Sequence, residues 1–144
     1  MQVEDLEIAK EKLKQENLAL VVAKNGKVIF ATDSHGIGGL LRAIQELENG
    51  MKGSSVADKI LGKAAALLCV YAEVARVFAI TASERGIQAL EDNKVFYRFE
   101  NTVPYILDSQ RRSMCPFERL VIEISNPKEA YERLKAFAAE RRLI

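Results

Sequence analysis

The chain has 144 residues, a formal net charge of +1 and 49% hydrophobic residues. This length fits one domain, spanning residues 1–144, and allows roughly 68% of the unfolded surface to be buried without help from disulfides. A nearly neutral chain has no overall field to attract nucleic acid or anionic lipid, which argues against a wholly electrostatic nucleic-acid binder. The longest apolar run, residues 64–72, is about half the length needed to span a bilayer.

The two cysteines indicate a reducing compartment. Cys69 lies within an apolar run and Cys115 precedes a proline, which is not the pattern of a secreted disulfide framework. The N-terminal residues are charged and amphipathic, without the apolar core of a signal peptide. We therefore expect a cytoplasmic protein with no membrane association.

The first elements expected along the chain are a helix and a hairpin. Apolar residues spaced from Leu6 to Leu13 predict an opening helix that ends near Asn17. Two β-rich runs, 18–24 and 27–32, are separated by the dipeptide Asn-Gly, whose residues both tolerate positive φ. These runs should pair as antiparallel strands.

The middle of the chain alternates helices and strands. The glycine-rich stretch "SHGIGG" precedes an expected helix over residues 40–48, which "NG" then ends. A second helix is predicted over residues 56–74, after two serines. Then follow, in order, a strand at 76–83 buried on both faces, a helix at 84–93 and a strand at 94–100.

The C-terminal part ends in a helix. Residues 101–114 have no regular pattern, and "CPFERLVIEI" predicts a short helix or a helix leading into a strand. The terminal helix has Ser125 or Asn126 as its cap and Pro127 at its first position. This order of elements predicts a mixed sheet with both faces covered, which is a three-layer α/β/α sandwich.

The expected helix at 56–74 is polar only at its beginning. On a helical wheel Asp58, Lys59, Gly62 and Lys63 share one arc, and later positions of that arc are apolar. A helix that is apolar all round is buried, so the polar arc should lie at the end of a central helix, where a cleft could open. We therefore take these four residues as candidate ligand-binding or catalytic groups.

The same residues also have a structural interpretation. Ser55 and Asp58 have the spacing of a capping box, in which the Asp58 carboxylate would satisfy backbone N–H groups of the first turn. Lys59 and Lys63 would then be solvated. Both interpretations are consistent with the sequence.

Cys115 is a candidate reactive thiol. Pro116 suits the first position of a helix, which makes Cys115 the cap and Glu118 its capping-box partner or a ligand-binding residue. A thiolate at a helix N-terminus is stabilised by the helix dipole, and Arg111 and Arg112 are near in sequence. The alternative is a capping residue on a loop.

The remaining polar candidates are weaker. Cys69 is expected to be a buried small residue. His35, in "SHGIGG", either contacts a ligand or belongs to a flexible turn. A single histidine argues against the usual multi-histidine metal sites, so neither a metal nor another cofactor is expected.

The order of elements, with "ADKILGKAAALL" and the later "CPFE", resembles a family of small prokaryotic proteins of unknown function with a cytidine deaminase-like fold. Its signature stretches are matched here by Asp58, Lys59, Gly62 and Lys63, and by Cys115, Pro116 and Glu118. The zinc enzymes of that fold use H-x-E and P-C-x-x-C at the starts of two helices. The stretches "ADK" and "ASERG", aligned to these starts, contain neither His nor Cys, so the resemblance does not imply a zinc-dependent deaminase.

Three functions follow as hypotheses. The first is binding of a small nucleobase- or nucleotide-like ligand at the start of the 56–74 helix. The second is metal-free catalysis by Cys115 as a nucleophile or by Lys63 as a desolvated amine. The third is a non-catalytic interaction module, with an oligomer possible and nucleic acid an unlikely partner.

Overall fold

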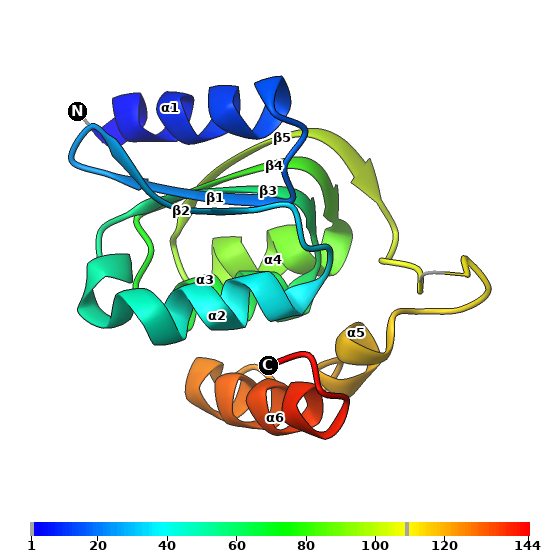
Figure 1. Cartoon of the computed structure of the whole chain (residues 1–144). Helices are drawn as coiled ribbons and strands as arrows, with labels where there is room; N and C mark the ends of the chain where they lie inside the picture. The colour runs from blue at the N-terminus through cyan, green and yellow to red at the C-terminus, as the bar shows by residue number, and fades with distance from the viewer. Residues whose placement is uncertain (1, 109) are drawn as a thin grey trace.

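The computed structural model describes residues 2–108 and 110–144 as a five-stranded mixed sheet with helices on both faces (Figure 1). The strand order is β2-β1-β3-β4-β5; β1 is antiparallel to β2 and β3, and the last three strands are parallel. The strands are β1 (Leu20–Lys24), β2 (Lys27–Thr32), β3 (Ser55–Leu61), β4 (Arg76–Ser83) and β5 (Phe96–Val103). The helices are α1 (Gln2–Gln15), α2 (Ile37–Leu47), α3 (Lys63–Tyr71), α4 (Glu84–Asp92), α5 (Pro116–Leu120) and α6 (Pro127–Glu140), with a 3₁₀ turn at Glu48–Met51.

The hairpin predicted from Asn25-Gly26 is confirmed. Both turn residues have positive φ, 54° and 80°, as a tight two-residue connection requires. The buried Asp5 carboxylate of α1 accepts hydrogen bonds from the backbone N–H groups of Asn25 at 3.0 Å and Gly26 at 2.7 Å. The first helix is therefore fixed to the hairpin turn by charge-assisted hydrogen bonds.

The helices form layers of unequal size. The amphipathic helix α1 packs on one face of the sheet, around Leu6, Leu13 and Phe78. The opposite face is covered by α2, α3 and α4, and α6 packs behind α3 (Figure 1). The predicted α/β/α sandwich is confirmed, and α5 and α6 add a further outer layer to it.

The predicted helix at 56–74 is wrong in its first part. Residues Ser55–Leu61 form the central strand β3, and the helix begins only at Lys63. Gly62 separates the two elements; its extended backbone (φ −106°, ψ −169°) ends the strand and precedes the first turn of α3. The Ser55–Asp58 capping box is therefore also wrong, because both residues lie in a strand.

The apolar character of α3 follows from its neighbours. It packs against β3, α2, α4 and α6, so residues 64–69 are all buried whichever way they point. A helix surrounded in this way has no solvent-facing side that needs polar residues. The helix α3 therefore has no polar face after Lys63 because it is buried between the layers of the fold.

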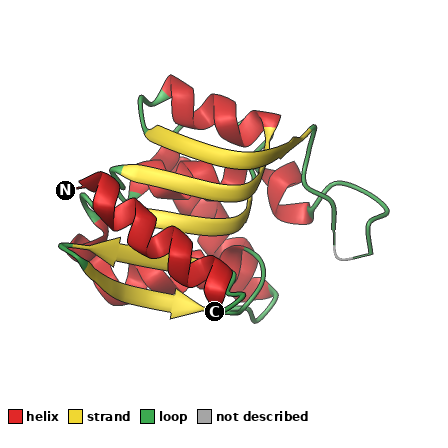
Figure 2. Cartoon of the chain, turned by 90° about the horizontal axis from the view of Figure 1, so that it is seen from above, coloured by secondary structure: helices red, strands yellow, loops and turns green. Residues whose placement is uncertain are grey.

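The other predicted elements are found close to their expected positions. The strand at 76–83 has the predicted bounds, and α6 begins at Pro127 with the Asn126 side chain accepting from the Glu129 N–H at 2.9 Å. The irregular segment after β5 leaves the body of the fold as a long loop before α5 (Figure 2). No helix in the described part of the chain has the length and apolar character needed to cross a bilayer.

Candidate functional site at the start of α3

One edge of the sheet collects the starts of three helices. Because β2, β3 and β4 run in the same direction, α2, α3 and α4 all begin at the carboxyl ends of these strands. Ligands of open α/β sheets bind outside these ends, near the point where the strand order reverses. In this sheet the reversal lies between β1 and β3, the strand that leads into Gly62 and Lys63.

The N-terminus of α3 is held by a carboxylate from a distant part of the chain. Glu118 of α5 accepts hydrogen bonds from the backbone N–H groups of Lys63 at 2.7 Å and Ala64 at 2.8 Å. Its side chain is buried, and burial raises its pKa, while the two N–H donors lower it. The carboxylate thus satisfies two free donors and complements the helix dipole.

Two glycines make room for this contact. A Cβ on Gly62 would lie 2.3 Å from the Glu118 Oε1 atom, and a Cβ on Gly86 would lie 2.9 Å from the Gly62 carbonyl carbon. Both distances are shorter than real Cβ atoms tolerate. Gly62 therefore admits the carboxylate, and Gly86 lets α4 approach the start of α3.

The signature stretch at 58–63 and the signature stretch at 115–118 therefore meet through the Glu118 side chain. Cys115 is the N-cap residue of α5 with Pro116 at the first position, as predicted, and its side chain makes no capping hydrogen bond. The expected capping box between Cys115 and Glu118 is wrong, because the Glu118 carboxylate faces α3. Cys115 is partly exposed, and its reactivity stays a prediction.

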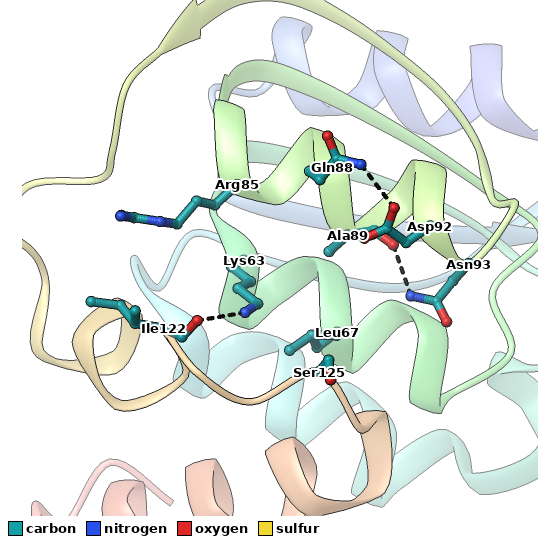
Figure 3. Close-up of a pocket in the computed structure, with 9 residues that line it drawn as sticks. All are labelled: Lys63, Leu67, Arg85, Gln88, Ala89, Asp92, Asn93, Ile122 and Ser125. Carbon is teal, nitrogen blue, oxygen red and sulfur yellow. Dashed lines mark hydrogen bonds between the residues drawn. The ribbon is translucent and has the colours of Figure 1, made fainter.

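Lys63 lines a cleft between α3, α4 and the segment that joins α5 to α6. The cleft has a volume of about 380 Å³, within the range of small-molecule sites. The Lys63 ammonium group donates to the Ile122 carbonyl at 2.8 Å (Figure 3). Burial and the neighbouring Arg85 charge lower the pKa of Lys63. The lining residues are Lys63, Leu67, Arg85, Gln88, Ala89, Asp92, Asn93, Ile122 and Ser125.

The polar wall of this cleft comes from α4, whose residues we did not predict as part of a site from the sequence. Arg85, Gln88 and Asp92 are spaced at i, i+3 and i+7, so they share one face of the helix. Gln88 donates to Asp92 at 2.8 Å, and Arg85 extends away from that pair (Figure 3). This spacing was the available signal for the missed residues.

Asp58 lies on β3, apart from the cleft lining. Its register partners Leu20 and Ala79 belong to the core on the α3 side of the sheet, and its Oδ1 accepts from the Ile60 N–H at 3.2 Å. Burial raises the pKa of Asp58 to about 7, against the lowering effect of that hydrogen bond. Lys59 donates to the Asn17 side chain at 3.0 Å, so the expected common arc of the two residues on a helix is wrong.

The other candidates are placed as follows. Cys69 is fully buried in α3, as expected, and burial raises the pKa of its thiol. His35 lies exposed in the loop before α2, and its contact with a ligand stays a prediction. Among the described residues, no three His, Cys, Asp or Glu side chains lie close enough together to hold a metal ion.

The arrangement of the sheet and helices defines an α/β protein with a cytidine deaminase-like fold. Solved structures of RibD from Acinetobacter baumannii match it with a TM-score of 0.51. The form 2 structure is 16% identical; the match covers 69% of this chain and 36% of that one. At this identity the likeness shows the fold alone.

A family model described as "TM1506: Domain of unknown function (DUF1893)" matches residues 8–138, and the chain belongs to this family. The crystal structure of a DUF1893 family protein from Thermotoga maritima is similar to this chain with a TM-score of 0.82 and 25% identity. The match covers 88% of this chain and 84% of that one. A search of curated proteins found no significant match.

Proposed function

We propose that the protein binds a small nucleobase- or nucleotide-like ligand in the cleft beside Lys63. The observation that carries the proposal is the position of this cleft, where the Glu118-capped start of α3 faces a polar wall on α4. One end of the cleft, at Lys63 and Arg85, lies near the carboxyl edge of the parallel strands, where ligands of such sheets bind, and the other end reaches Asn93 at the end of α4. Its volume of about 380 Å³ suits a ligand of this size.

The chemistry of the lining favours a polar, anionic molecule. Lys63 and Arg85 bring two positive charges and Asp92 one negative charge, so the wall is positive overall. Gln88, Asn93 and Ser125 add groups that both donate and accept hydrogen bonds, as recognition of a heterocyclic base requires. A base would lie against the apolar surface of Leu67 and Ala89, with a phosphate near the cations.

A titration followed by amide NMR tests the proposal. Cytosine, adenine, their nucleosides and their 5′-monophosphates are added in turn to the labelled protein. We expect a monophosphate to shift the amide signals around Lys63, Gln88 and Asp92 most strongly. Shifts confined to other surfaces, or no shift with any of the six compounds, would contradict the proposed site.

A pair of variants assigns the binding to the cleft. Lys63→Met keeps the apolar stem and removes the ammonium charge, whereas Lys27→Met removes an exposed charge from the hairpin. Lys63→Met should weaken the monophosphate by about tenfold or more, as expected for loss of a charge-assisted hydrogen bond. Lys27→Met should bind like the parent protein.

One observation also favours a metal-free enzyme. The lowered pKa of Lys63 increases the fraction of neutral amine, which is the form that attacks a carbonyl carbon and expels water to give an imine. Borohydride reduction in the presence of pyruvate or an aldose phosphate, followed by peptide mass analysis, tests this alternative. Labelling of Lys63 would support it, and labelling spread over exposed lysines would oppose it.

A further inference from the structure

The outer edge of β5 is an open strand edge with exposed side chains. Among the described strands, β5 stands at the end of the sheet beside β4, and most of its residues are exposed. Phe96 is 44% exposed and Phe99 is 40% exposed, which is unusual for large apolar residues on a strand. Proteins protect such edges because their free N–H and C=O groups pair with other strands.

The sequence of β5, "FYRFENTV", is complementary to itself in the antiparallel direction. When two copies pair with Phe99 opposite Phe99, Arg98 of each copy lies opposite Glu100 of the other. Opposite charges placed directly across a strand pair stabilise it, and like charges destabilise it. The same register places Tyr97 opposite Asn101.

The structure already orients these charges. Arg98 pairs with Phe78 in the parallel register, and Phe78 belongs to the α1 side of the sheet. On that face Arg98 lies 3.9 Å from the Glu7 carboxylate, and Glu100 forms an ion pair with Lys14. Each Arg98–Glu100 contact between two copies would connect the Glu7–Arg98 pair of one copy to the Glu100–Lys14 pair of the other. The four side chains then form a row of alternating charges.

Two of the aromatic residues, Tyr97 and Phe99, lie on the other face. Phe99 pairs with Ala79, which belongs to the core on the α3 side, and its ring stacks on Tyr97 at a centroid distance of 6.1 Å. At the two-fold axis the two Phe99 rings would meet and cover each other. The pairing of the two Phe99 rings and the pairing of Arg98 with Glu100 thus require the same register.

The opposite edge of the sheet lacks this pattern. The edge strand β2, "KVIFAT", contains Lys27 and no acidic residue, so no antiparallel register pairs opposite charges across two copies. Complementarity between copies is therefore specific to β5. A two-fold symmetric interface of this kind uses the same surface patch on both copies and gives a closed dimer.

We propose that two copies of the chain associate through β5 in antiparallel orientation, centred on Phe99. The two five-stranded sheets then form one continuous ten-stranded sheet. The partner is a second copy of this chain, and the recognition elements are backbone hydrogen bonds, two Arg98–Glu100 contacts and the paired Phe99 rings.

A charge-swap series followed by size-exclusion chromatography with light scattering tests the proposal. The parent protein should be a dimer, and Arg98→Glu should be monomeric because it places two acidic residues opposite each other at each end. Arg98→Glu with Glu100→Arg restores opposite charges across the joint and should restore the dimer. Circular dichroism verifies that each variant is folded.

Disulfide trapping fixes the register. In a Cys115→Ser background, Phe99→Cys places two thiols at the two-fold axis, and mild oxidation should give a covalent dimer. Ala31→Cys, on the exposed edge of β2, is the matched control and should not crosslink. A monomeric parent protein, a double variant that stays monomeric, or equal crosslinking of both cysteine variants would overturn the proposal.

Discussion

The helices α3 and α4 lie side by side and begin at the same edge of the sheet, yet their N-termini are stabilised in different ways. The first turn of α4 is capped by the residue before it, because the Ser83 hydroxyl accepts from the Gly86 N–H at 3.0 Å. The first turn of α3 has Gly62 before it and no local cap. Glu118, 55 residues further along the chain, supplies the missing acceptor.

This difference connects stability to the candidate site. A local cap serves its own helix, whereas a distant cap also determines where the capping element lies. By holding the start of α3, Glu118 brings α5 and the following segment to Lys63, whose ammonium group then contacts the Ile122 carbonyl. The cleft therefore depends on the contact of Glu118 with the start of α3, which joins the two signature stretches.

The largest expected effect follows from removing the distant cap. Glu118→Ala leaves two N–H donors at the start of α3 without their carboxylate, and we expect a loss of about 3–4 kcal/mol in the free energy of unfolding. Urea denaturation measures this loss. Glu132→Ala removes an exposed acidic residue of α6 and should change stability by less than about 0.5 kcal/mol. Similar stabilities for the two variants would show that Glu118 is not a cap.

A second prediction compares Glu118 with Asp58, a carboxylate with weaker hydrogen bonding. Its pKa of about 7 in the folded protein exceeds the value of about 3.9 in an unfolded chain. Between these values the folded state holds a proton that the unfolded state has released, so this contribution to stability is present below about pH 4 and lost as pH rises to 7.

Asp58→Asn removes this titration, because the amide stays neutral. Relative to the parent protein, the variant should gain about 2–3 kcal/mol in the free energy of unfolding between pH 5 and pH 8. Urea denaturation at both pH values measures the change. If the difference between variant and parent is the same at both, Asp58 does not titrate as described.

The smallest effect is expected for the local cap. Ser83→Ala removes one neutral acceptor from the start of α4 and should cost about 1 kcal/mol. The cleft beside Lys63 should keep its shape, which the amide spectrum reports. A loss as large as that of Glu118→Ala would remove the distinction between the two helix starts.

Much of the fold could be predicted because its signals are local. The hairpin depends on Asn25-Gly26, and α6 depends on Asn126 and Pro127, each of which acts within a few residues. The strand β3 was missed because Asp58 and Lys59 gave it the polar positions of a helix. Their side chains lie on opposite faces of the sheet, as alternation in a strand requires.

The candidate site was only partly predictable. Gly62, Lys63 and Glu118 were identified as important, but the contact that joins them spans 55 residues and has no signal in sequence spacing. The glycine at position 62 does carry information, because it marks both the end of β3 and the close approach of the carboxylate. The spacing of Arg85, Gln88 and Asp92 marks one face of α4, but the contact of this face with Lys63 follows from helix packing, which a single sequence does not reveal.

Hydrogen exchange at the starts of α3 and α4 tests the central claim most directly. In the parent protein the Lys63 and Ala64 amides should be protected, as should the Gly86 amide. In Glu118→Gln we expect the first two to exchange at least about tenfold faster than the change in global stability explains, while Gly86 follows global stability alone. Unchanged relative protection of Lys63 and Ala64 in this variant would contradict the claim that Glu118 holds the start of α3.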